Sequence, residues 1–147
     1  MLPPFQDDGK LPVGLHWAEW HEIEERFGGN PHRGRLLEGF RTAAQNLQGA
    51  GCRAIFLDGS FVTAKELPGD FDACWDLTDV DPDQIDPVFL EFDNRRAAQK
   101  ARFGGEFFPA QWPEGCSGKT FLEFFQLDKD TGDSKGIVGL DLRRWRS

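Results

Sequence analysis

Apolar side chains recur every three or four positions in two N-terminal stretches, the spacing of one face of an α-helix. The first stretch predicts a helix over 17–27, with an apolar face formed by Trp17, Trp20, Ile23 and Phe27. The second predicts a helix over 31–49, which Asn30 caps and Pro31 begins. Residues 1–14 contain three prolines and two glycines, so we expect an extended arm there.

The middle of the chain has strand patterns. Residues 53–57 form a short apolar run, which predicts a buried strand. Over 71–76 apolar and polar residues alternate, which predicts a second strand. Side chains two positions apart on a strand point the same way, so Asp70 and Asp72 are expected to share one face, about 6–7 Å apart.

The C-terminal part predicts a helix, a loop and a hairpin. We expect a short helix and loops over 77–93, followed by a helix over 94–103 that Asn94 caps. Residues 104–119 contain glycines and prolines and are expected to form a long loop. The phenylalanine-rich 120–127 and the apolar 137–142 predict two strands, joined by a polar turn at 128–136.

Length and composition limit this pattern to one domain. The chain has 147 residues, of which 39% are hydrophobic and 29% charged, and no apolar run approaches the roughly 20 residues of a membrane span. Fourteen Phe and five Trp, with no Tyr, are expected to build the core. We therefore predict a single α/β (α+β) domain over 1–147, with a small mixed sheet flanked by helices.

Charge and cysteine content narrow the function classes. The net charge is −8, which argues against a general nucleic-acid binder and favours metal cations as ligands. Three widely spaced cysteines without a C-x-x-C pair argue against a disulfide framework or a structural zinc site. The first ten residues lack the basic and apolar regions of a secretory signal, so a cytoplasmic location is expected.

The stretch from Asp58 to Asp72 contains residues suited to phosphate chemistry. Gly59 allows backbone N–H groups to approach phosphate oxygens closely, and Ser60 adds a hydroxyl donor. Two carboxylates on one strand face, Asp70 and Asp72, suit a hard divalent cation such as Mg²⁺. A third carboxylate from a neighbouring strand would complete a two-metal site, which aligns a hydroxyl with the α-phosphate of a nucleotide.

With the preceding helix and strand, this order resembles the nucleotidyltransferase superfamily with the polymerase-beta-like fold. The match consists of Gly59-Ser60, nine further residues and Asp70-Phe71-Asp72, and the resemblance covers 31–142. It implies that Asp70 and Asp72 are catalytic metal ligands and that Gly59 and Ser60 hold the triphosphate of an NTP. The family carries a lysine at the place of Lys65, which implies a phosphate contact there.

The third carboxylate of the resemblance has three candidates. Glu123 lies among aromatic residues in the predicted strand 120–127. A charged side chain in such an apolar segment indicates a functional role, so Glu123 is favoured as the third catalytic residue. Asp128 and Asp141 are the alternatives.

The resemblance implies magnesium-dependent nucleotidyl transfer from an NTP to a hydroxyl of a protein or a nucleic acid. Related minimal nucleotidyltransferases belong to toxin–antitoxin pairs, so a toxin or antitoxin is the expected protein partner. The alternative is a catalytically degenerate, antitoxin-like protein that acts by binding its partner.

Overall fold

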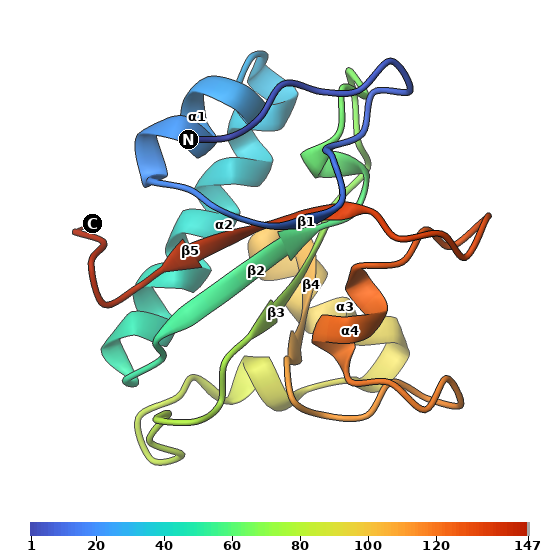
Figure 1. Ribbon diagram of the computed structural model, residues 1–147. Coiled ribbons are helices and arrows are strands. Elements are labelled where there is room, and N and C mark those ends of the chain that lie inside the picture. Colours follow the sequence, from blue (N-terminus) through green and yellow to red (C-terminus); the bar gives the residue numbers. More distant parts are fainter. Residues whose placement is uncertain (147) are drawn as a thin grey trace.

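Five strands pair into one mixed sheet in residues 1–146, the part of the chain that the computed structural model describes (Figure 1). The strands are β1 (Gly14–Trp17), β2 (Ala54–Asp58), β3 (Phe71–Trp75), β4 (Gly105–Pro109) and β5 (Gly136–Asp141). Their order is β1-β5-β2-β3-β4. β2 runs antiparallel to both β5 and β3, while β1 with β5 and β3 with β4 are parallel. The predicted fold class, a small mixed sheet flanked by helices, is confirmed.

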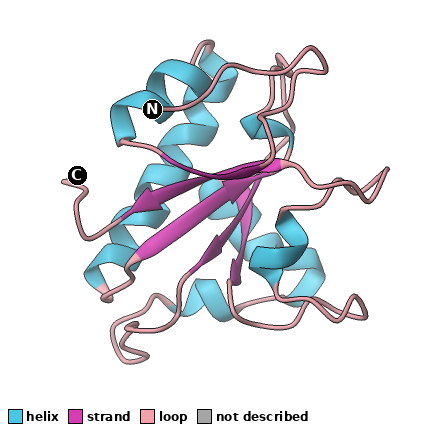
Figure 2. Ribbon diagram, in the orientation of Figure 1, coloured by secondary structure: helices cyan, strands magenta, loops and turns pink. Residues whose placement is uncertain are grey.

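The helices lie on both faces of this sheet (Figure 2). They are α1 (Trp20–Phe27), α2 (Pro31–Gly49), α3 (Asp93–Phe103) and α4 (Phe121–Phe125), with two short 3-10 turns at Ser60–Val62 and Pro87–Leu90. The prediction for α2 is confirmed at both ends. The Asn30 side chain accepts a hydrogen bond from the Arg33 N–H at 2.8 Å, and Pro31 takes the first helical position, where its missing donor costs nothing.

The larger core lies between the sheet and α1, α2 and α3. Phe71 stands near its centre, with its ring edge-to-face against Phe40 on α2 and Phe107 on β4, both at 5.5 Å between centroids. A smaller cluster on the other face brings Phe56 and Cys74 together with Phe125 of α4. Apolar residues on both faces hold the sheet between two layers, which leaves the ends of the strands for polar side chains.

The first predicted helix begins later than expected. Gly14–Trp17 pairs with β5 as a strand, and α1 starts at Trp20 behind a capping box formed by Glu19 and Glu22. Trp17 therefore lies on the edge strand and is 47% exposed. Helical spacing of the aromatic residues predicted the helix correctly from Trp20 onward but was wrong for the three residues before it.

The predicted hairpin over 120–142 is wrong in its first half. Phe121–Phe125 is the helix α4, because the Thr120 and Glu123 side chains satisfy each other's backbone N–H groups in a capping box. β5 nearly coincides with the strand predicted over 137–142. It pairs with β1 and β2, however, and not with residues 120–127 as the hairpin required. The structure also places a strand, β4, inside the predicted loop 104–119.

The predicted helix over 94–103 lies within α3. Asn94 does not cap it, because the N-cap position is taken by Phe92, whose side chain makes no capping hydrogen bond. Asn94, Arg95 and Arg96 lie inside the helix bounds with positive φ angles.

Among the helices of residues 1–146, none combines the length and the apolar character that crossing a membrane requires.

Candidate functional site

The turn after β2 is shaped by Gly59. Its φ of +87° and ψ of −172° belong to a region that essentially only glycine adopts. A β-carbon on Gly59 would lie 3.0 Å from Asp72 Oδ2 and 3.3 Å from the Asp72 backbone nitrogen. The missing side chain thus lets the turn that carries Ser60 lie directly against the Asp72 carboxylate.

Three adjacent strands each contribute one carboxylate at this end of the sheet. Asp58 at the end of β2 pairs with Asp72 on β3, and Asp72 pairs in turn with Glu106 on β4. Residues paired directly across strands point to the same face, so the three side chains form a row. Asp70 lies two positions before Asp72 and faces the same cavity. Asp70 thus precedes β3 while Asp72 lies on it, and the structure brings both residues to one cavity.

A cavity of about 620 Å³ is lined by two carboxylates of this row, Asp58 and Asp72, while Glu106 lies outside it. Its walls come from the N-terminal arm (8–11), the turn and loop 58–65, the start of β3 and the loop 128–136. The cavity is lined by five of the residues that the sequence predicted for the site: Gly59, Ser60, Lys65, Asp70 and Asp72. Lys10, Lys129 and Lys135 also line it, so lysines face the carboxylates across the cavity.

Burial makes the carboxylates expensive to ionise. The pKa of Asp72 is raised to about 6, chiefly by removal from water and also by the neighbouring Asp70, Glu106 and Asp58 charges, while Lys129 opposes the rise. Burial and Glu106 likewise raise the pKa of Asp70. Clustered carboxylates with raised pKa values gain most from an added cation.

Ion pairs occupy the two flanking carboxylates. Lys135 Nζ lies 2.9 Å from Asp58 Oδ1, close enough for charge attraction but without hydrogen-bond alignment. Glu106 contacts Arg96 Nε at 3.1 Å and Lys100 Nζ at 2.8 Å, both from α3. Among the carboxylates of the row, Asp72 in the middle therefore makes no ion pair with any residue of 1–146, and the same holds for Asp70.

The loop behind Ser60 is held by a buried arginine. Arg33, on the first turn of α2, is 6% exposed and donates to the backbone carbonyls of Phe61 (2.7 Å), Thr63 (2.8 Å) and Lys65 (2.5 Å). It also donates to the Phe27 carbonyl at 3.2 Å. Burial lowers the pKa of this guanidinium, yet it remains charged. Arg33 thereby fixes the course of the loop that lines the cavity.

None of the three candidates for a third carboxylate lies beside Asp72 in the row. Glu123, in the capping box of α4, is exposed and does not line the cavity. Asp141 lies opposite Ala54, at the other end of β2, and binds Arg143 Nε at 3.1 Å. Asp128 lines the cavity, but Lys10 binds its carboxylate and lowers its pKa to about 2.

Sequence reasoning missed Glu106, which holds the position beside Asp72 instead. It lies in a stretch whose glycines and prolines indicated a loop. One signal was available. Glu106 precedes Phe107 and Phe108, and such an apolar run is typical of a short strand.

Within residues 1–146, no group of three or more His, Cys, Asp or Glu side chains is arranged to hold a metal ion. Mg²⁺ commonly binds through one or two carboxylates together with substrate phosphates, so the donor set of Asp70 and Asp72 fits a metal that arrives with a phosphate ligand.

Comparison with known proteins gives one match. Residues 3–141 match a protein family described as "Family of unknown function (DUF6932)". No curated protein and no solved structure matches the chain. The resemblance to nucleotidyltransferases therefore stays a prediction.

Proposed function

The chain belongs to the DUF6932 family of unknown function, and we propose from the site itself that it is a magnesium-dependent nucleotidyltransferase. The observation that carries this proposal is the contact between the Gly59-Ser60 turn and the Asp72 carboxylate, with Asp70 and Glu106 beside it. A turn suited to phosphate shares one cavity with Asp70 and Asp72, which make no ion pair in residues 1–146, and transfer of a nucleotide needs such a combination.

Asp70 and Asp72 are the proposed metal ligands. Both line the cavity, and the raised pKa of each indicates a site that a cation would stabilise. Bound Mg²⁺ would neutralise the triphosphate and polarise its α-phosphate. Two protein carboxylates suffice because phosphate oxygens supply further ligands.

The other residues would bind and orient the substrate. Ser60 lines the cavity, and its hydroxyl, with backbone N–H groups of its turn, would donate to phosphate oxygens. Lys65 and Lys129 line the same cavity and would add positive charge around the triphosphate. The reaction is attack of an acceptor hydroxyl oxygen on the α-phosphorus, with pyrophosphate leaving.

Glu106 is the proposed third carboxylate, in place of Glu123. Its pairing opposite Asp72 gives it the relation to the Asp-x-Asp strand that the resemblance requires of a later strand. In this role its carboxylate would accept the proton of the attacking hydroxyl. The acceptor is proposed to belong to a partner macromolecule, a toxin or antitoxin being the kind that the resemblance implies.

One observation favours the alternative, a degenerate protein that binds its partner without transferring a nucleotide. Arg96 and Lys100 both contact the Glu106 carboxylate, and two neighbouring cations weaken a general base. In this alternative the cavity has lost its catalytic activity, and the protein functions by binding a partner protein through its surface.

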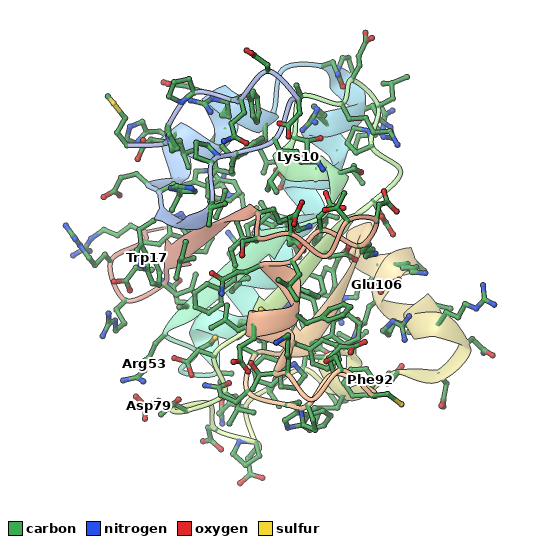
Figure 3. All side chains as sticks on the ribbon, turned by 45° about the vertical axis from the view of Figure 1, so that its right-hand side comes forward. Lys10, Trp17, Arg53, Asp79, Phe92 and Glu106 are labelled. Carbon is green, nitrogen blue, oxygen red and sulfur yellow. The ribbon has the colours of Figure 1, made fainter. Side chains whose placement is uncertain are left out.

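Labelled nucleotides distinguish the two functions. The protein is incubated with each α-labelled NTP, Mg²⁺ and an extract of cells that lack it, and label on macromolecules is measured. We expect transfer that is lost in Asp70→Asn and in Asp72→Asn. The matched control is Asp79→Asn, because Asp79 pairs with Arg53 at 3.3 Å and lies away from Lys10 and Glu106 (Figure 3).

The outcomes separate clearly. Transfer that is lost in both site variants and retained in the control supports catalysis. Absence of magnesium-dependent NTP binding by the wild type, measured by calorimetry, contradicts the proposal. Partner binding that survives in Asp72→Asn, with no label moved by any protein, favours the alternative.

A further inference from the structure

A second cavity lies between α4 and the sheet, and all three carboxylates of the row, Asp58, Asp72 and Glu106, line it. Its volume is about 140 Å³. Its wall is divided about evenly between apolar residues, Phe108, Phe121, Phe124, Phe125 and Leu127, and charged residues, which include Glu106 and Glu114. The Phe121 ring stacks on the Phe108 ring at 4.3 Å between centroids and 14° between planes. Phenyl rings in the wall of a cavity offer surface on which a flat, unsaturated ligand can stack.

This aromatic cavity adjoins the larger one. Both are lined by Asp58, Asp72, Lys129 and Lys135. A molecule that spans the two would have a charged part among lysines and carboxylates and a flat part among phenylalanines. A nucleoside triphosphate is divided in this way, with its polyphosphate at one end and its base at the other.

The size and polarity of the aromatic cavity narrow the choice of base. A cavity of about 150 Å³ holds one benzene ring, so a volume of about 140 Å³ fits a single six-membered ring better than the fused rings of a purine. Glu114 also lines the cavity, and its carboxylate has no hydrogen-bond or ion-pair partner in residues 1–146. A carboxylate only accepts hydrogen bonds, so it selects a ring that carries an amino group.

We propose that the aromatic cavity is the base subsite of the nucleotide site and that it takes the cytosine ring of CTP. This inference rests on the proposed function and adds the identity of the nucleotide. It also assigns α4 a role, because α4 supplies three of the ring-bearing residues within a single small domain.

Calorimetry in Mg²⁺ with four probes tests the subsite. The probes are CTP, UTP, ATP and inorganic tripolyphosphate, which has the charge of the triphosphate but no base. Stacking of a base on aromatic side chains, at about 1–3 kcal/mol, predicts that CTP binds about 5-fold to 150-fold tighter than tripolyphosphate. CTP is also expected to bind more tightly than UTP and ATP.

Variants with matched controls locate the effect. Phe124→Leu removes a half-buried ring of the cavity and should weaken CTP binding about tenfold without changing tripolyphosphate binding. Its control is Phe92→Leu, because Phe92 stacks on Phe108 at 6.2 Å but does not line the cavity (Figure 3). Leu127→Trp, which fills the cavity, provides a second variant should Phe124→Leu lose its fold by circular dichroism. Glu114→Gln should reduce the preference for CTP over UTP, with the exposed Glu91→Gln as its control.

The results that overturn the inference differ from those that overturn the proposed function. Equal binding of CTP and tripolyphosphate by the wild type overturns the base subsite alone. So does a preference for ATP, or a loss of CTP binding in the control Phe92→Leu that equals the loss in Phe124→Leu. Failure of both CTP and tripolyphosphate to bind in Mg²⁺ overturns the proposed function, and the subsite with it.

Discussion

Asp72 Oδ2 lies 3.0 Å from the point where a β-carbon on Gly59 would stand. The two residues come from neighbouring strands, β3 and the end of β2, whose pairing brings Asp58 opposite Asp72. The absence of a side chain at Gly59 is therefore a condition for placing the Ser60 turn against the carboxylate. The glycine-specific conformation of Gly59 thus allows Ser60 and the Asp72 carboxylate to lie in the same site.

Gly59→Ala is expected to destabilise the protein and to weaken nucleotide binding. The φ of +87° costs a residue with a β-carbon about 1–3 kcal/mol, and the new methyl group also presses on Asp72. Urea unfolding and calorimetry with Mg²⁺ and CTP measure the two effects. Gly69→Ala is the control, since a β-carbon there would meet no atom within 4 Å. Equal effects of the two substitutions would contradict the described turn.

The parts of the fold that were predictable from sequence are those whose signals are local. The helix 31–49 has its own cap, its own proline and an apolar face, and it was predicted to the residue. The Gly59-Ser60 turn and the Asp70-x-Asp72 strand are also local patterns, and the structure brings them to one cavity. Local signals suffice where the preference of a segment agrees with its tertiary environment.

The missed parts depend on partners distant in sequence. β1 is a strand only because β5 lies beside it, and β4 only because β3 does. Glu106 lies in the site because β4 pairs with β3. The residues around Glu106 favour a strand but do not indicate which strand it pairs with. In the opposite sense, aromatic residues at 121–125 favoured a strand, but the Thr120–Glu123 capping box starts a helix there.

Substitution of Glu106 and of Glu123 should separate the two candidates for the third carboxylate. Glu106→Gln keeps the size of the side chain but removes its charge, and we expect nucleotide transfer to fall about 100-fold or more, within the range for loss of a general base. Glu123→Gln should leave transfer unchanged, because the side chain is exposed and belongs to the helix cap. Both are measured as kcat with labelled NTP. The opposite ranking would return the role to Glu123.

Arg33→Lys should loosen the loop 61–65. Lysine cannot reproduce the planar fork that reaches the Phe61, Thr63 and Lys65 carbonyls together, and the buried carbonyls left without donors predict a loss of about 2–4 kcal/mol in the free energy of unfolding. Hydrogen exchange of the amides of 61–65 should become faster.

Arg26→Lys is the control for this loop. Arg26 donates to the carbonyls of Pro3 at 2.6 Å and Leu2 at 3.3 Å, so it fixes the arm rather than the loop. We expect no change of exchange at 61–65 in this variant. Exchange that rises equally in both variants would mean that Arg33 acts only on global stability.

The half-buried Asp72 carboxyl should make stability fall as the pH rises, in the absence of divalent metal. Its pKa is about 6 in the folded state against an ordinary 3.8, so between these values the folded protein holds a proton that the unfolded chain has lost. Deprotonation then favours the unfolded state progressively from about pH 4 to about pH 6, with a loss approaching 3 kcal/mol at 1.36 kcal/mol for each pKa unit. Urea unfolding at several pH values measures this loss.

Asp72→Asn isolates this group from the others that titrate. The amide keeps the shape of the side chain but has no proton to lose, so the wild type should lose stability relative to the variant between about pH 4 and pH 6. Added Mg²⁺ should reverse the difference near pH 7, because a cation favours the ionised carboxylate. A stability difference that stays constant across this pH range, with and without Mg²⁺, would show that Asp72 is not the half-buried, cation-deficient carboxylate on which the proposed site depends.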